Sequence, residues 1–140
     1  MSSRRVPVVT FELAAVPASV ACARHWVLAF AQEHTSDRDV HERVAIAFTE
    51  AFTNAVRHAY GEEAASDNEI CVCADVEDGS LEIMVVDHGR GIRAGSSSPG
   101  LGAGMGIIAQ CADAFAVSER QPSGTEIWMR FDLRTEDPDR

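Results

Sequence analysis

The chain has 140 residues, of which 46% are hydrophobic, and its formal net charge at pH 7 is -10. This length suits one folded domain that buries roughly two-thirds of its unfolded surface. The negative charge disfavours direct binding to nucleic acid or to anionic lipid. All 12 basic residues are arginine, and without lysine the chain can form neither a Walker-A phosphate loop nor the lysine site of protein kinases.

The first elements predicted along the chain are a strand and two helices. Residues 7–13 are rich in β-branched and aromatic side chains, which predicts a strand. Pro17-Ala18-Ser19 predicts the start of a helix that runs to about His34, with Ser19 as its cap. A second helix is predicted over about 39–60. Its buried stripe would be Val44, Phe48, Ala51, Ala55 and Ala59, with Glu50, Asn54 and Arg57 or His58 on another face.

A hairpin is predicted next, after an acidic loop over residues 62–68. Residues 70–76 and 81–86 read as its strands, because the Asp78-Gly79 pair between them is a strong turn signal.

The last predicted elements are a third helix, from Ile107 to about Ala114, and two strands over residues 115–119 and 125–133. Elements in this order predict an α+β two-layer sandwich, with about three helices on one face of a mainly antiparallel mixed sheet. Residues 1–133 would form one domain and residues 134–140 a disordered tail.

The four cysteines are Cys22, Cys71, Cys73 and Cys111. Cys71 and Cys73 share one face of a strand, but no second pair with zinc-finger spacing follows, so no metal site is predicted for them. Small buried core thiols in a reducing compartment are the favoured interpretation. No signal-peptide pattern and no apolar run of membrane-spanning length is evident, so a soluble cytoplasmic protein is expected.

Residues 49–60 contain a polar pattern that suggests chemistry. Glu50 and Asn54 are four residues apart, so a helix places both on one face. Threonine and asparagine are poor helix formers, so Thr49, Thr53 and Asn54 in one helix call for a reason. A bound magnesium nucleotide supplies one, with Asn54 as a metal ligand and Glu50 as a base. The alternative is the solvated face of an amphipathic helix.

An aspartate and two glycines follow the predicted strand 81–86. Asp87 can point its carboxylate into a pocket, while Gly89 and Gly91 let the backbone approach a flat ligand. A carboxylate that accepts a hydrogen bond from an exocyclic amino group selects adenine over guanine. The alternative is an ordinary Asp-x-Gly turn.

A second glycine-rich segment, residues 100–106, is predicted to precede the third helix. Its alternating glycines would present free amides and the positive end of the helix dipole to phosphates. Their spacing is not that of the dinucleotide-binding fingerprint. The alternative is a flexible linker, although a helix follows directly.

Together these motifs resemble those of the GHKL (Bergerat-fold) ATPases, in the same order and with matching spacing over about residues 40–130. The positions that match the N box and the first, second and third glycine boxes are, in turn, Glu50 and Asn54; Asp87, Gly89 and Gly91; Gly104 and Gly106; and Gly124 with Thr125. The third box is the weakest match, because a Gly-Thr pair is more often a hairpin turn.

Within that superfamily the chain is most similar to the anti-sigma-factor serine/threonine kinases, over nearly its whole length. The resemblance implies an ATP- and magnesium-binding kinase that phosphorylates a STAS-domain anti-anti-sigma partner. It also implies that the protein sequesters a sigma factor as a homodimer and so regulates transcription. Function as a histidine kinase is not expected, since no histidine dimerisation domain is evident.

The resemblance also implies roles for individual residues. Glu50 would be the catalytic base that deprotonates the acceptor hydroxyl, Asn54 would hold Mg²⁺ against the phosphates, and Asp87 would bind the adenine amino group. Arg24 and the first helix are candidates to face a partner, with an ordinary helix surface as an equal alternative. The other implied nucleotide-binding positions are Arg57, His58, Gly89, Gly91, Gly102, Gly104, Met105, Gly106 and Thr125.

One departure from the family pattern concerns the lid over the nucleotide. Only eight residues, 92–99, separate Gly91 from Gly100, whereas the best-known kinases of this type have a longer segment. Arg90 or Arg93 is a candidate to contact the γ-phosphate in its place. A short lid also favours an alternative, a nucleotide-dependent sigma-factor-binding module without significant kinase activity. A third alternative is a degenerate fold that binds neither nucleotide nor metal.

Overall fold

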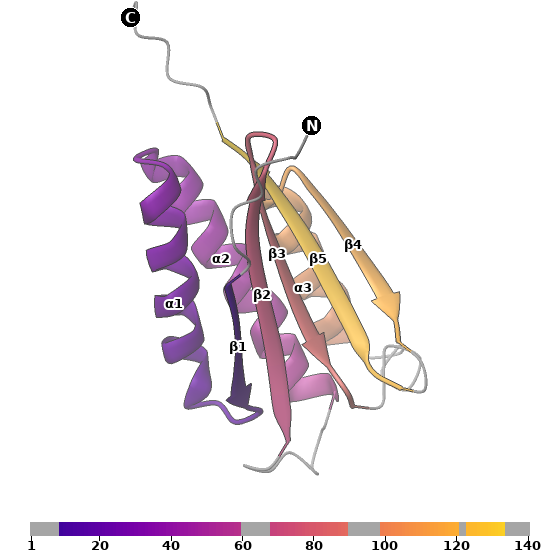
Figure 1. Ribbon diagram of the computed structural model, residues 1–140. Coiled ribbons are helices and arrows are strands. Elements are labelled where there is room, and N and C mark those ends of the chain that lie inside the picture. Colours follow the sequence, from indigo (N-terminus) through magenta and orange to yellow (C-terminus); the bar gives the residue numbers. More distant parts are fainter. Residues whose placement is uncertain (1–8, 60–67, 90–98, 121–122, 134–140) are drawn as a thin grey trace, which may run out of the picture.

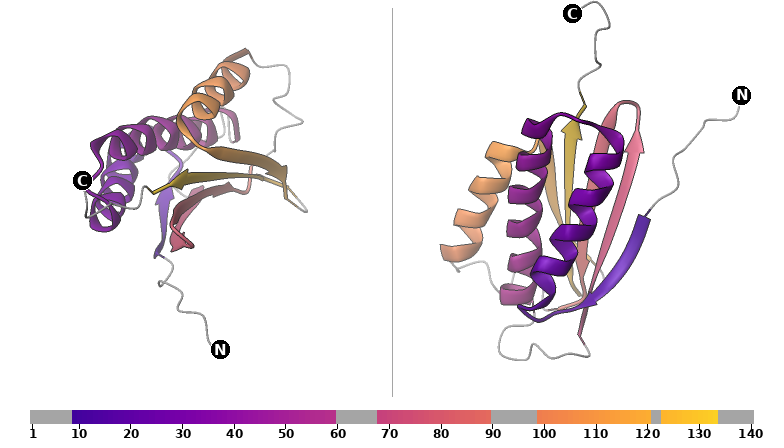
Figure 2. Two further views of the ribbon diagram at one scale, coloured as in Figure 1. Left: turned by 90° about the horizontal axis from the view of Figure 1, so that it is seen from above. Right: turned by 90° about the vertical axis from the view of Figure 1, so that its left-hand side faces the viewer.

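Strands and helices form two layers in the computed structural model, which describes residues 9–59, 68–89, 99–120 and 123–133 (Figures 1 and 2). The described strands are β1 (Val9–Ala14), β2 (Glu69–Glu77), β3 (Ser80–Asp87), β4 (Ala114–Glu119) and β5 (Thr125–Asp132). They form one sheet in the order β1-β2-β3-β5-β4, and each pairing is antiparallel. The helices cover one face of this sheet, which confirms the predicted α+β sandwich. The expected tail, 134–140, lies outside the described residues.

The first helix, α1 (Ser19–His34), starts close to the predicted position but is not capped by Ser19. Ala18 already has helical dihedral angles, and no side chain caps the helix. A backbone turn organises the entry instead, because the N–H of Ser19 donates to the carbonyl of Val16 at 3.0 Å and the N–H of Val20 to that of Pro17 at 3.1 Å. The prediction of a serine cap is therefore wrong.

The second helix, α2 (Arg38–Asn54), continues directly into a π-helical turn, η1 (Ala55–Ala59). Its start is capped by Asp37, whose carboxylate accepts a hydrogen bond from the N–H of Asp39 at 2.9 Å, as is typical of helix N-termini. The third helix, α3 (Pro99–Cys111), begins eight residues before the predicted start at Ile107. No helix of the described chain is long and apolar enough to cross a membrane.

Alternating side chains divide the sheet into a covered face and an open face. On the covered face, buried residues of β2, β3 and β5 meet buried residues of α1, α2 and α3. The largest of these side chains are Phe48 and Phe52 of α2 and Phe131 of β5, all fully buried. The β2–β3 hairpin turns at Asp78 and Gly79, whose φ angles of 55° and 79° suit a tight two-residue turn.

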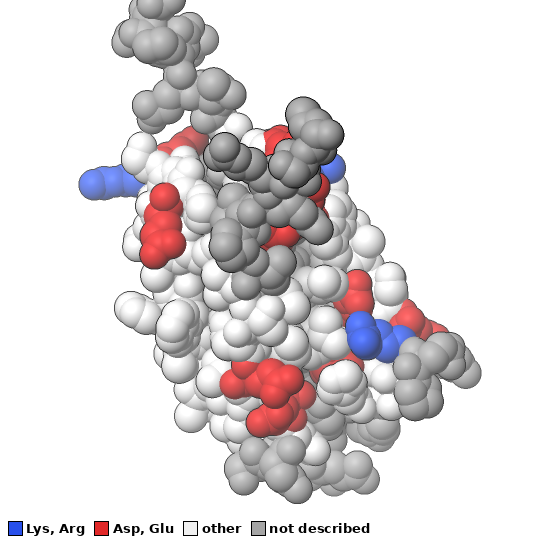
Figure 3. Space-filling model, viewed as in Figure 1, with Lys and Arg blue, Asp and Glu red and all other residues white. Residues whose placement is uncertain are grey.

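The open face is seen in Figure 3, with acidic side chains around a middle that carries few charges. Cys73, Met84 and Trp128 are cross-strand neighbours there. The Nε1–H of Trp128 donates to Glu82 at 3.1 Å. This face therefore keeps an apolar strip that the helices do not cover.

The prediction of buried core thiols is wrong. Cys22 is exposed on α1, and the other three cysteines are only partly buried. Cys71 and Cys73 alternate along β2 with the core residues Ile70 and Val72, so they lie on the open face of the sheet. Burial raises the pKa of Cys71 to about 11, which keeps this thiol protonated and poorly reactive at neutral pH.

Candidate functional site

Four segments with predicted site residues meet at one end of the molecule. The carboxyl ends of α2 and β3 and the amino ends of α3 and β5 lie together at the lower end of Figure 1. Asp87, the last residue of β3, pairs with Thr125, the first residue of β5. η1, which follows Asn54, contacts β3. The fold therefore gathers the predicted N box, the first glycine box and the third glycine box.

Asn54 is buried at this end, and the alternative of a solvated helix face is wrong for it. Only 5% of its surface is exposed, and its Nδ2 has no hydrogen-bond partner among the described residues. An unpaired buried polar group costs about 1–3 kcal/mol, so stability alone does not favour this side chain. A carboxamide here fits a magnesium nucleotide, because its oxygen can ligate the metal while its nitrogen donates to a phosphate.

The helix changes its geometry directly after Asn54. The N–H of Ala55 reaches the carbonyls of both Ala51 and Phe52, and η1 follows. Short π-helical turns occur frequently at functional sites. Arg57 lies exposed on this turn, while the side chain of His58 lies outside the described part of the structure.

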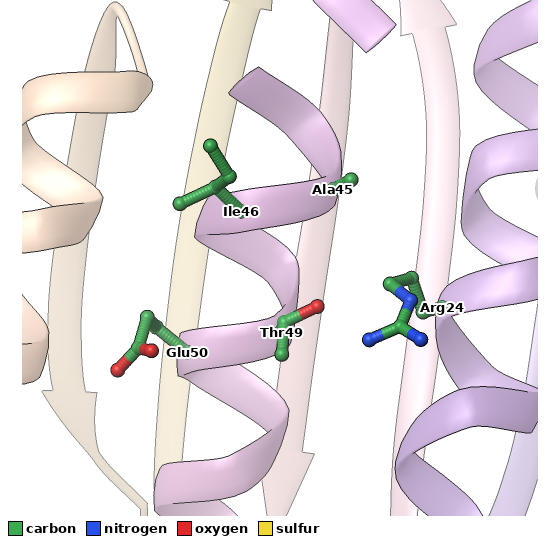
Figure 4. Close-up of a pocket in the computed structure, with 5 residues that line it drawn as sticks. All are labelled: Arg24, Ala45, Ile46, Thr49 and Glu50. Atoms are coloured by element: carbon green, nitrogen blue, oxygen red, sulfur yellow. The ribbon is translucent and has the colours of Figure 1, made fainter. Parts of the chain in front are cut away.

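Glu50 lies one turn before Asn54 and is partly buried. Figure 4 shows that it points away from α1, on the side of α2 that faces α3, whereas Thr49 points toward Arg24 of α1. Glu50 is therefore close along the helix to Asn54 and still reachable from solvent, as a base for an incoming hydroxyl must be.

A groove of about 320 Å³ runs along the outer surface of α1 and α2 (Figure 4). It is lined by Arg24, Ala45, Ile46, Thr49 and Glu50. Ile46 is 48% exposed, and the Oγ1 of Thr49 is buried without a partner among the described residues. The groove shares only Glu50 with the predicted nucleotide site. The sequence interpretation missed it, although an isoleucine among polar positions of α2 was a signal.

Asp87 is buried against the start of β5, with 5% of its surface exposed. Its Oδ1 accepts a hydrogen bond from the N–H of Gly89 at 3.0 Å, and the backbone of Thr125 provides a second. Burial raises the pKa of the Asp87 carboxyl, against the lowering effect of these two bonds. The bond to the Gly89 N–H is that of an ordinary Asp-x-Gly turn, while a carboxylate that binds adenine in a pocket stays a prediction.

Gly124 allows the two strands to meet at Asp87. Its φ is 117°, and a Cβ at this position would collide with the carbonyl oxygen of Asp87 and lie 3.0 Å from the Cα of His88. A larger residue would therefore push Thr125 away from Asp87. The predicted third glycine box marks a close backbone approach and is more than a turn residue.

The second glycine box lies inside α3 and not ahead of it, so the predicted placement before the helix is wrong. Only the first four N–H groups of a helix lack an intrahelical partner, and Gly104 and Gly106 lie beyond them. Met105 packs against the core, but a Cβ at Gly106 would contact nothing within 4 Å. Glycine within a helix lowers its stability by about 0.5–1 kcal/mol relative to alanine. Contacts in the helical conformation therefore do not explain why residue 106 is a glycine.

The segment predicted to cover the nucleotide lies almost wholly outside the described residues. Gly91, Arg90 and Arg93 lie outside the described residues, as does most of the segment 92–99. For Gly102 the structure gives only its place in the backbone of α3.

Known proteins share this sequence pattern. The family of the histidine kinase-like ATPase domain matches residues 13–131. The anti-sigma F factor of Clostridium acetobutylicum is 31% identical over 119 residues, which cover 77% of this chain and 81% of that relative.

Two solved structures share the fold. One contains the RsbU and RsbW domains of Rv1364c from Mycobacterium tuberculosis, with a TM-score of 0.73 at 20% identity over 94% of this chain; the chain spans 34% of that protein. The other is the SiaB–SiaC complex of Pseudomonas aeruginosa, with a TM-score of 0.67 at 14% identity over 88% of both chains. The chain therefore belongs to the histidine kinase-like (GHKL) ATPases and, within them, to the anti-sigma-factor kinase family.

Proposed function

We propose that this protein is a cytoplasmic anti-sigma factor and a serine/threonine kinase that uses magnesium ATP to phosphorylate a STAS-domain partner. We also propose that it sequesters a sigma factor as a homodimer. The observation that carries the proposal is the buried carboxamide of Asn54, one helical turn from Glu50, whose Nδ2 has no hydrogen-bond partner among the described residues. A degenerate fold without a ligand would gain nothing from this unpaired group.

The chain's residues divide the work of binding and transfer. Asp87 would accept a hydrogen bond from the adenine amino group, and Asn54 would hold Mg²⁺ against the phosphates. When bound, ATP supplies the γ-phosphoryl group. Glu50 would take the proton of the acceptor hydroxyl while the hydroxyl oxygen bonds to the γ-phosphorus, and the bond from that phosphorus to the bridging oxygen would break so that ADP leaves.

The groove along α1 and α2 is the place where we expect the acceptor segment to approach. It opens beside Glu50 and combines a cation, Arg24, with the exposed apolar side chain of Ile46. The relative in Clostridium acetobutylicum is named an anti-sigma F factor, which supports a sigma factor as a further partner.

A phosphotransfer assay with a STAS-domain protein as acceptor tests the kinase. Replacing a general base costs about 10²- to 10⁴-fold in rate, so Glu50→Gln should lose transfer by that factor and keep the wild-type affinity for ATP. Glu42→Gln is the matched control, since Glu42 is an exposed glutamate of the same helix. Loss of ATP binding together with transfer would contradict the role of Glu50 as a base.

The second candidate function is a nucleotide-dependent sigma-binding module without useful catalysis. The short segment 92–99 favours it, because eight residues give a small cover over the nucleotide. The same assay separates the two functions: ATP binding and sigma-factor capture without any transfer would support the module. Phosphorylation of the STAS partner by the wild type, but not by Glu50→Gln, would exclude it.

A further inference from the structure

Arg43 of α2 reaches the far end of α3, away from the glycine box. Its Nη1 donates to the carbonyl oxygen of Cys111, the last residue of α3, at 2.9 Å. The last four carbonyl groups of a helix lack intrahelical partners, and a cation beside them is favoured by the helix dipole. The guanidinium therefore provides a hydrogen-bond donor for a free carbonyl group of α3 and fixes the carboxyl end of this helix.

The same guanidinium is itself fixed from two sides. Its Nε donates to Asp39 at 2.9 Å, and its Nη1 lies 3.5 Å from Asp113. Asp113 in turn accepts a hydrogen bond from the N–H of Asp132 at 2.7 Å. Arg43 thus joins α2, the end of α3 and the end of β5 in one network, with its side chain only 25% exposed.

The two ends of α3 differ in what holds them. Its carboxyl half contains the buried Ile108 and ends on Arg43, whereas its first eight residues include four glycines. Glycine weakens a helix, so a change of backbone that frees amides for phosphates costs least in those residues. Because the carboxyl end of α3 is fixed, such a change of backbone is confined to its amino end.

We propose that Arg43 is a positioning residue for the nucleotide site. This inference rests on the proposed function. By fixing the carboxyl end of α3 on α2, Arg43 keeps the glycine box within reach of Asn54 while the box rearranges around phosphates. Arg43 does not touch the nucleotide, because it lies eleven positions before Asn54, which is about 16 Å along the helix.

Calorimetry with magnesium ATP, well below the melting temperature of each variant, tests the affinity. Arg43→Gln should weaken binding about tenfold. Arg43→Lys should recover part of it, since an ammonium group can still donate to the Cys111 carbonyl. Arg38→Gln is the matched control, because it removes one positive charge from an exposed residue of the same helix, and it should bind like the wild type.

Hydrogen exchange measures an ATP-dependent effect that would not change if the role of Arg43 were purely structural. In the wild type, ATP should alter exchange in residues 100–106 and leave residues 107–113 unchanged. In Arg43→Gln, the ATP-dependent change should extend into 107–113.

Wild-type affinity in Arg43→Gln, with the change still confined to 100–106, would overturn the positioning role and leave the proposed function standing. Failure of the wild type to bind ATP at all would overturn both.

Discussion

The adenine side and the phosphate side of the predicted site are built differently. Around Asp87, backbone groups of Gly89 and Thr125 already hold the carboxylate, and Gly124 provides the close approach that makes this possible. The buried Nδ2 of Asn54 has no hydrogen-bond partner among the described residues, and the predicted second glycine box forms part of the helix α3. If the proposed function holds, the adenine side is organised before the ligand arrives, whereas the phosphate side would be completed by the ligand.

This difference predicts how binding energy is distributed. The adenine side should bind without rearrangement, since its donors and acceptors are already in place. The phosphate side should require α3 to change, and the cost of that change lowers the observed affinity for any nucleotide with phosphates.

The largest effect in this comparison is expected on the adenine side. Asp87→Asn removes a charged acceptor, and a hydrogen bond to a charged group contributes about 1.5–3 kcal/mol, so ATP affinity should fall roughly ten- to a hundred-fold. Glu82→Gln, which changes a partly buried glutamate on the open face of the sheet, is the control in the same titration. An unchanged affinity in Asp87→Asn would mean that this carboxylate does not read adenine.

The same substitution should not destabilise the free protein at neutral pH. Burial raises the pKa of Asp87, so the folded state binds this proton more tightly than the unfolded state. The wild type should therefore gain stability as the pH falls through the raised pKa and lose it as the pH rises. Asp87→Asn should lack this part of the pH dependence in thermal melts between pH 3 and pH 8. If Asp87 instead stabilised the wild type only at high pH, this result would contradict a pKa raised by burial.

A smaller effect on ATP affinity is expected from a substitution within α3, on the phosphate side. Gly106→Ala should stabilise the free protein by about 0.5–1 kcal/mol, because a Cβ there meets nothing within 4 Å. If α3 must unwind around phosphates, the same change should weaken ATP binding a few-fold. Gln110→Ala, an exposed position near the other end of α3, should leave ATP affinity unchanged. Equal ATP affinity in Gly106→Ala and wild type would show that α3 binds phosphates as it stands.

Periodicity predicted the elements of the sheet well, because residues such as Ile70, Val72 and Ala74 alternate strictly with more exposed ones. It misjudged α3, since four glycines read as a break, whereas packing of Met105 and Ile108 on the core holds them in a helix. Local propensity is a weak guide where tertiary contacts decide.

The motifs predict which residues form the candidate site, which stays a prediction, but the surroundings of these residues could not be predicted from the sequence. A helical pattern placed Asn54 away from the buried stripe, and only the sheet shows that β3 contacts the turn after it. The prediction of core cysteines on β2 is wrong, because a sequence does not say which face of a strand the helices cover. Arg43 had no motif at all; its role depends on a contact across 68 positions of the sequence.

The most direct test of the account is a calorimetric titration of the wild type and Asn54→Ala with ATP, each with and without Mg²⁺. A nucleotide site at Asn54 predicts magnesium-dependent binding by the wild type that Asn54→Ala loses. The variant should also melt no lower than the wild type, because the Nδ2 that it removes has no hydrogen-bond partner among the described residues. Equal binding by both proteins, or none by the wild type under either condition, would contradict the assignment of the nucleotide site.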